Sequence, residues 1–175
     1  MRKHNLQLLQ GGRQMLSEPI TVAKTDYVVN IYDVAKTFLY FRPMSHKKLQ
    51  KLCYYAEAWY LTLTGNKLSN SEFQAWVHGP VSPELYDQYR MYGLSQIQQQ
   101  RELPRTITTN KRIFDFLSKI DKIYGDMSAN ELEVLTHSED PWRIARKGFS
   151  RLEPCVTPIC DDDIIRFYSQ KLNKR

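Results

Sequence analysis

The sequence predicts a mainly α-helical, compact single-domain fold around one central helix, with a minimal β-hairpin or short sheet beside it. Three observations lead to this prediction. Apolar residues recur at helical spacing in several segments, residues typical of helix ends bracket those segments, and only one clear run alternates as a strand does. The chain has 175 residues, 42% hydrophobic and 25% charged, a balance that lets one domain bury its own core.

Two parts are expected along the chain. Residues 1–26 are predicted to be an N-terminal extension, since Gly11-Gly12 interrupts any helical pattern there. This extension is either a flexible leader or a segment that orders against a partner or against the domain. The domain is predicted to span residues 27–175. Its first helix follows a cap at Asn30 and has its apolar face at Ile31, Val34, Ala35, Phe38 and Leu39.

The central helix is predicted over Ser45 to Leu63. Ser45 can cap its first turn, and Gly65 can end it in the left-handed conformation. Two apolar stripes run along it, so we expect neighbours to cover the helix on two sides. The first stripe is Leu49, Leu52, Cys53, Ala56, Tyr60 and Leu63, and the second is Tyr54, Ala58 and Leu61.

A short strand is predicted next, at Phe73–Val77, with Trp76 out of phase with the buried face. The run ends in a His78-Gly79-Pro80 turn, and Ser82 followed by Pro83 begins the next helix. A second strand is expected at 106–108. Six or seven helices are expected in all, the later ones over 113–124, after the Ser128/Glu131 capping box, after Asp140-Pro141 and from Asp161. The Asp161–Asp163 run is interpreted as a helix start and not as a metal site.

Three lysines break a local rule, because Lys47, Lys48 and Lys51 crowd the positive end of the central helix, where acids are preferred. One interpretation is an exposed, solvated basic edge. The other is a docking surface for an acidic partner, since sequences break local rules at functional sites.

The search for enzyme motifs finds none. The sequence has no Gly-rich phosphate loop, no GxSxG and no HExxH, and Cys155, Cys160 and His137 match no standard zinc spacing. We therefore expect no enzyme, no cofactor and no metal. Three cysteines without CxxC spacing indicate a reduced, cytoplasmic protein, and no apolar run is long enough to span a membrane.

The net charge of +6 fits either an acidic protein partner or nucleic acid. No helix-turn-helix pattern is present, so nucleic acid is disfavoured as the primary partner, although Arg143, Arg146 and Lys147 could meet phosphates. Aromatic residues are the more distinctive feature, with 11 Tyr and 3 Trp. Trp76, Tyr86 and Trp142 are difficult to place inward by periodicity, and such side chains favour protein interfaces. Trp142 equally fits a place in the core.

The chain resembles a known family in three segments: KKLQKLCYYAEAWYL, EFQAWVHGPVSPELYDQYRMYG and EDPWRIARKG. They are similar to the Panacea domain, also described as the SocA-like antitoxin domain, in its basic helix with a Tyr54-Tyr55 pair, its Ala75–Val81 turn and its following tyrosine-rich helix. The resemblance covers roughly Tyr32 to Gly148 and, more weakly, the C-terminal helix; residues 1–26 lie outside it.

The resemblance implies a non-enzymatic bacterial or phage-encoded antitoxin, a class that includes phage-defence systems. Such a protein binds and neutralises a cognate toxin, as a hetero-oligomer with it. Alternatives are an adaptor that delivers the toxin to a Clp-type protease, and a DNA-binding transcriptional regulator. The residues expected to contact the partner are Lys47, Lys48, Lys51, Trp76, His78, Tyr86 and Trp142.

Overall fold

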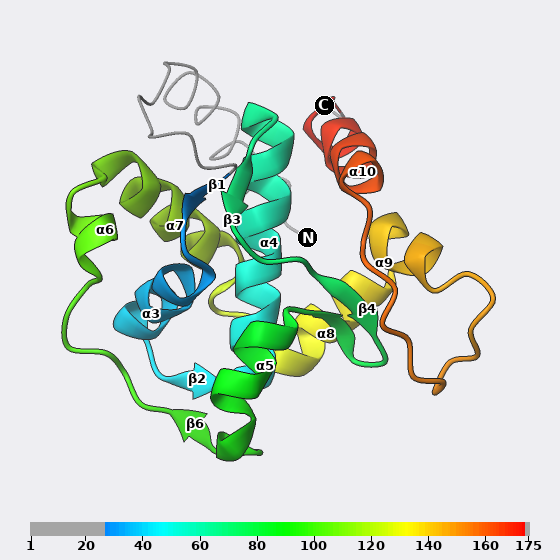
Figure 1. The fold of residues 1–175 in the computed structure, drawn as a ribbon, viewed down its shortest axis with the longest axis horizontal. Coiled ribbons are helices and arrows are strands. Elements are labelled where there is room, and N and C mark those ends of the chain that lie inside the picture. Colours follow the sequence, from blue (N-terminus) through cyan, green and yellow to red (C-terminus); the bar gives the residue numbers. More distant parts are fainter. Residues whose placement is uncertain (1–26, 174–175) are drawn as a thin grey trace.

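The structure is a computed structural model that describes residues 27–173, and the predicted extension at 1–26 lies outside the described residues. The described chain is mainly helical, as the sequence predicted, with one central helix, α4 (His46–Thr64), through the middle of the molecule (Figure 1). The other helices are α3 (Ile31–Phe41), α5 (Pro83–Tyr89), α6 (Arg105–Thr108), α7 (Lys111–Tyr124), α8 (Ala129–His137), α9 (Asp140–Ala145) and α10 (Asp161–Asn173), with a 3-10 turn η2 (Arg90–Tyr92).

Helix α4 is enclosed on all sides over much of its length, because every residue from Leu49 to Leu61 is buried. Both predicted apolar stripes are buried, which confirms the prediction. Helices α3, α7, α8 and α10 contact α4. Its ends are the predicted ones. The Ser45 side chain accepts a hydrogen bond from the Lys48 amide, and Gly65 ends the helix at φ 74°.

The β-structure consists of three two-stranded sheets in the described chain. The predicted strand forms β4 (Gln74–Trp76), which pairs antiparallel with β5 (Gly79–Val81) and sets Trp76 opposite Gly79. The sequence did not predict the other two sheets, since their strands are too short to show alternation. They are β1 (Tyr27–Val29) with β3 (Lys67–Ser69), which are parallel, and β2 (Met44–Ser45) with β6 (Gln96–Ile97), which are antiparallel.

The prediction of a strand at 106–108 is wrong, because these residues belong to helix α6. Pro104 begins this turn, since its fixed φ suits a helix start and its carbonyl accepts from the amides of Ile107 and Thr108. The Thr108 hydroxyl also bonds back to the Arg105 carbonyl, at 2.9 Å. Local side-chain bonding of this kind overrides the β preference of threonine.

Aromatic side chains join α4 to its neighbours. The Tyr55 ring stacks on Tyr124 of α7 with centroids 4.1 Å apart, and the Trp59 indole nitrogen donates to the Tyr124 hydroxyl at 2.8 Å. These buried polar groups therefore have partners, which removes most of the cost of placing them in the core. The prediction that Tyr60 and Cys53 belong to the core is confirmed.

Two buried carboxylates, Glu57 and Glu139, connect α4 to neighbouring helices and strands by hydrogen bonds. Glu57 accepts hydrogen bonds from the amides of Leu68 and Ser69 and from the Ser69 hydroxyl, which docks β3. Burial raises the pKa of Glu57 to about 7, although the bond from Ser69 opposes that rise. The second is Glu139, which joins α4, α9 and α10. Its carboxylate accepts from the hydroxyls of Tyr55 and Tyr168 and from Lys171 Nζ.

Candidate functional site

The candidate site is a groove with a volume of about 790 Å³. Four parts of the chain line it: the start of α4 (residues 45–51), the β4–β5 hairpin with α5 and the turn after it (76–94), the start of α8 (129–130) and the segment 154–156. We call it the Trp76 groove after the aromatic residue on its hairpin. These parts are far apart in sequence, so only the fold brings them together.

The hairpin is held against α4 by main-chain and side-chain hydrogen bonds. The Gln50 side chain donates to the Ser82 carbonyl at 3.0 Å and accepts from the Ser82 amide at 2.8 Å, much as a peptide group would. Segment 157–159 pairs with β4 on its other edge, where the Ala75 amide donates to the Thr157 carbonyl at 2.9 Å. The hairpin therefore lies between α4 and this segment.

One half of the groove is aromatic and apolar. The Trp76 and Tyr86 rings lie 4.9 Å apart between centroids, and His46 meets Tyr86 edge-on at 6.0 Å. Leu94 and Val156 also line this half, and their side chains are 103% and 67% exposed. Exposed apolar side chains beside an aromatic pair are a feature that protein-binding surfaces share.

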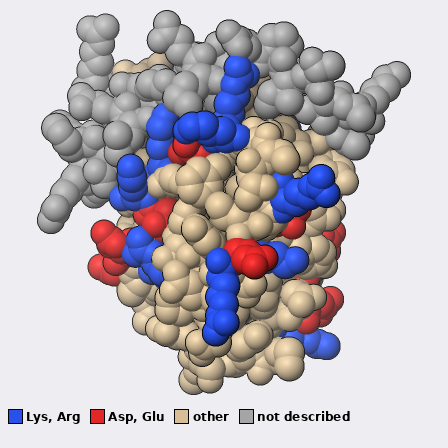
Figure 2. Space-filling model, turned by 90° about the vertical axis from the view of Figure 1, so that its left-hand side faces the viewer, with Lys and Arg blue, Asp and Glu red and all other residues tan. Residues whose placement is uncertain are grey.

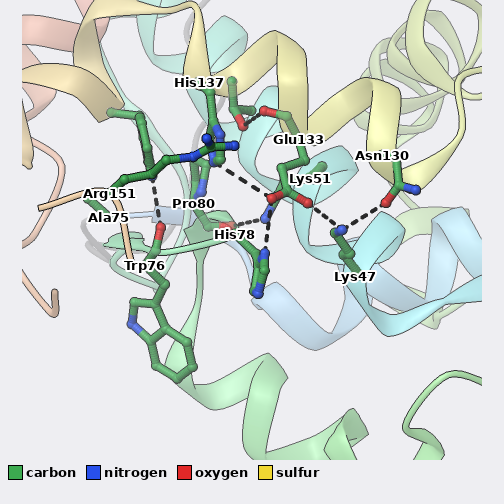
Figure 3. Close-up of polar contacts among 12 residues, drawn as sticks. Lys47, Lys51, Ala75, Trp76, His78, Pro80, Asn130, Glu133, His137 and Arg151 are labelled. Carbon is green, nitrogen blue, oxygen red and sulfur yellow. Dashed lines mark hydrogen bonds and ion pairs between the residues drawn. The ribbon is translucent and has the colours of Figure 1, made fainter. Parts of the chain in front are cut away.

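The other half is polar. Behind its lining, Glu133 on α8 contacts several of the polar side chains gathered there (Figure 3). The carboxylate pairs with Lys47, lies 2.9 Å from Nδ1 of His78 and 4.0 Å from Nε2 of His137. Lys47 Nζ also donates to the Asn130 side chain at 2.9 Å. Burial works against ionisation of Glu133, yet the hydrogen bonds from Lys47 and His78 hold its pKa below the ordinary value.

Lys51 lies beneath the hairpin and is only 1% exposed. Its Nζ donates to the Pro80 carbonyl at 2.9 Å, and burial lowers the pKa of Lys51 to about 7. Gly79 makes this approach possible. A Cβ at Gly79 would lie 2.7 Å from Cε of Lys51 and 2.7 Å from the Thr136 hydroxyl, and φ there is +96°.

The expectation that all three lysines at the start of α4 form an exposed edge is therefore wrong for Lys51. The physical reason is that the hairpin turn and α8 cover this face of α4. The residues around Lys51 in the sequence do not indicate which distant segment will cover it. Lys47 and Lys48 are partly buried. Lys48 Nζ points away from the groove and donates to the Gly125 carbonyl at 2.6 Å.

Five of the seven predicted contact residues line the Trp76 groove, and two do not. The five are Lys47, Lys51, Trp76, His78 and Tyr86. Besides Lys48, the residue outside is Trp142, which packs behind the hairpin. Sequence reasoning missed His46, Leu94 and Val156. Their only sequence signal was apolar or aromatic character within turns and at a helix start, which is too common to single them out.

The basic residues considered for phosphate binding are mostly engaged within the chain. Arg146 is buried and donates to the carbonyls of Ala75, Ser150 and Glu153, and Arg143 pairs with Asp140. On the face drawn in Figure 2, Lys and Arg side chains stand singly or in small groups with acidic ones between them. This distribution differs from the continuous basic stripe typical of nucleic-acid binding.

Comparison with known proteins gives the family. Residues 49–143 match the family described as antitoxin SocA-like, Panacea domain. The antitoxin SocA of Caulobacter vibrioides (strain NA1000 / CB15N) is 32% identical over 143 residues, which cover 75% of this chain and 76% of that protein. The chain belongs to this family.

The part matched to the SocA-like Panacea family supplies much of the groove. It contains Lys51, the β4–β5 hairpin, α5 and the start of α8, whereas residues 45–47 and 154–156 of the groove lie outside the matched residues. The family resemblance stated from the sequence is thus confirmed. No solved structure matches the chain. None of the helices in the described residues is long and apolar enough to cross a membrane.

Proposed function

We propose that this SocA-like Panacea protein neutralises a cognate toxin by direct protein–protein binding, with the Trp76 groove as the contact surface. The observation that carries the proposal is the groove itself, an apolar hollow with exposed large hydrophobic side chains at its rims, in a chain that belongs to an antitoxin family. The proposal is non-enzymatic: the antitoxin occludes a surface that the toxin needs.

The composition of the groove suits a protein partner. Trp and Tyr provide large contact areas at low entropic cost and dominate the energy of many interfaces. Trp76 and Tyr86 lie side by side in the groove, whose lining also includes the exposed residues Leu94 and Val156. Covering these side chains would remove apolar area from water.

The proposed contact residues are Trp76, Tyr86, Lys47 and His78 at the surface, with Lys51 below them. Lys48 is left out, because its ammonium group is already bonded on another side of α4. Trp142 supports the hairpin from behind. The net charge of +6 would speed encounter with an acidic toxin.

The test is co-expression with the product of the adjacent gene, followed by growth measurement and co-purification. The wild-type chain is expected to restore growth and to co-purify with the toxin. Leu94→Asp is expected to abolish both, since it places a charge on the apolar rim. Val134→Asp is the matched control, because Val134 is a similarly exposed apolar residue on α8 and does not line the groove.

Protection by Leu94→Asp equal to that of the wild type would place the contact elsewhere and contradict the proposal. The amount of toxin distinguishes occlusion from delivery to a protease. Occlusion predicts that the toxin persists in the complex. A fall in toxin level that depends on a Clp-type protease would instead support the adaptor alternative.

A further inference from the structure

The Trp76 groove has two chemically different ends. Trp76, Tyr86 and Leu94 contribute aromatic and apolar surface at one end. At the other, Lys47 and His78 surround the Glu133 carboxylate (Figure 3). A partner that fills the whole groove must therefore present an apolar group and a polar group close together.

The ionisable side chains that line the groove are mostly basic. Its lining in the described chain contains two lysines, Lys47 and Lys51, and two histidines, His46 and His78, but no aspartate or glutamate. Glu133 lies behind this lining and pairs with Lys47, and Lys51 is buried beneath the Pro80 carbonyl. An anionic group on the partner would thus meet basic side chains and no carboxylate on the lining itself, which favours an acidic group over a basic one.

Hydrogen-bonding capacity remains within the groove. An ammonium group can donate three hydrogen bonds, and Lys47 Nζ has two partners in the described chain, Glu133 and Asn130. Nδ1 of His46 is buried without a hydrogen-bond partner among the described residues, in a side chain that lines the groove. A carboxylate seated here could accept the remaining hydrogen bond of the Lys47 ammonium group.

We infer that the groove recognises a segment of the toxin in which a large apolar side chain lies next to an aspartate or glutamate. The apolar side chain packs against the paired rings of Trp76 and Tyr86, and the carboxylate is bound by Lys47 at the His78 end. This inference rests on the proposed function and adds the chemistry of the segment that is bound.

A toxin segment fits the groove better than a nucleic acid does. A nucleic-acid backbone presents a phosphate at every nucleotide, yet the lining holds only two lysines, and one of them, Lys51, is buried. Much of the remaining lining is apolar, including Val77, Val81 and Val156. One carboxylate beside one apolar anchor matches this distribution of charge.

The experiment uses the full chain and short overlapping peptides that tile the toxin, with affinities measured by fluorescence anisotropy. The peptides that bind are expected to contain a large apolar residue next to Asp or Glu. Changing that acid to its amide should weaken binding by about 10- to 100-fold, the range for one charge-assisted hydrogen bond. Lys47→Gln should weaken binding similarly and make the chain insensitive to the amide change, whereas Lys47→Arg should preserve the sensitivity.

Lys111→Gln is the matched control, because Lys111 is also an ion-paired lysine, with Asp115 at 2.7 Å, and lies on α7 away from the groove. It should leave peptide affinity unchanged. If no linear peptide binds, the same acid-to-amide changes are made in the intact toxin and titrated against wild type and Lys47→Gln.

The inference is overturned if binding is insensitive to every acid-to-amide change, or if Lys47→Gln and Lys111→Gln behave alike. It is also overturned if a single-stranded oligonucleotide displaces the bound toxin segment. These results leave the proposed function standing as long as the toxin is still neutralised and Leu94→Asp still fails. Failure of the proposed function would give a different result: the wild-type chain would neither bind nor neutralise the toxin.

Discussion

The indole nitrogen of Trp142 donates a hydrogen bond of 3.0 Å to the main-chain carbonyl of Trp76. Trp142 lies in α9 and Trp76 in β4, so this bond ties the rear of the groove's hairpin to a helix 66 positions further along the chain. The Trp142 ring also stacks on His137, with centroids 4.0 Å apart. Helix α9 therefore holds in place the strand that presents the groove's main aromatic side chain.

Replacing Trp142 by Phe should lower the free energy of unfolding by about 1–3 kcal/mol, since the Trp76 carbonyl loses its donor. Chemical denaturation followed by far-UV circular dichroism measures the change. Trp76→Ala provides the comparison. The Trp76 side chain lines the groove and that of Trp142 does not, so Trp76→Ala should cost far more toxin affinity than Trp142→Phe. A greater loss of toxin affinity in Trp142→Phe would show that Trp142 is the contact and Trp76 the support.

Gly79 and Gly148 offer a matched pair for testing how tightly the hairpin lies on α4. Their φ angles are +96° and +94°, but a Cβ at Gly79 would meet Lys51 and Thr136 at 2.7 Å, whereas a Cβ at Gly148 would meet nothing within 4 Å. Both alanine variants should lose about 1–3 kcal/mol of stability to backbone strain. Gly79→Ala should lose more and should also weaken toxin binding. Equal losses for the two variants would mean that the hairpin does not depend on this close approach.

Glu57 should make stability fall as the pH rises. Burial raises its folded pKa to about 7 from the ordinary 4.5, so between these values the folded protein keeps a proton that the unfolded chain has released. The stabilisation is complete below about pH 4.5 and is lost as the pH rises through 7, at about 1.4 kcal/mol per unit.

Glu57→Gln removes this titration and should flatten the slope in that window. It should also cost about 1–3 kcal/mol, because the two main-chain amides bond to different carboxylate oxygens and the NH₂ of glutamine would then face one of them, that of Leu68 or that of Ser69. Unfolding in urea across the pH range measures both effects. An unchanged slope in the variant would assign the pH dependence to other groups.

Lys51 should act in the opposite direction above neutral pH. Burial lowers its folded pKa to about 7 from 10.5, so above pH 7 the unfolded chain binds the proton more strongly and stability rises with pH. Together with Glu57, this gives a minimum in stability near pH 7. Lys51→Met should remove the rise above pH 7, as measured by the same urea series below the range where tyrosines titrate. A rise that persists in Lys51→Met would contradict this assignment.

The Glu139 network should anchor the C-terminal helix. Tyr168 of α10 donates to Glu139 at 2.7 Å, and Tyr168→Phe removes that donor without changing the packing of the ring. The expected loss is about 1–3 kcal/mol, as for a hydrogen bond to a charged acceptor. Tyr92→Phe, at the exposed turn η2, should change stability far less. Equal effects of the two changes would mean that the Glu139 bond adds nothing to the packing of α10.

Much of the secondary structure was predictable because its signals are local. The caps at Ser82 and Ser128, the Ser128–Glu131 capping box and the acidic start of α10 were all identified in the sequence, and the structure shows helices beginning there. The Asp161 side chain also pairs with Lys67, at 2.7 Å. The strand predicted at 106–108 was wrong for a local reason as well. A four-residue helix gives too short a pattern to outweigh the β preference of threonine and isoleucine.

The groove was predictable only in part. Trp76 and Tyr86 were identified as out of phase with buried faces, and the structure places them together at the surface of one hollow. His46 and Val156 could not be identified, because a histidine at a helix start and a valine in a loop have no distinctive pattern.

The sequence by itself determined the mainly helical fold, the position and the ends of α4 and the family, since capping, periodicity and motifs depend on residues close together in the chain. Only the tertiary structure decided that Lys51 is buried under Pro80 while Lys47 remains at the groove, and that Glu133 meets both Lys47 and His78. The physical reason is that burial and ion pairing depend on which distant segment covers a side chain. That choice is made by the packing of the whole core.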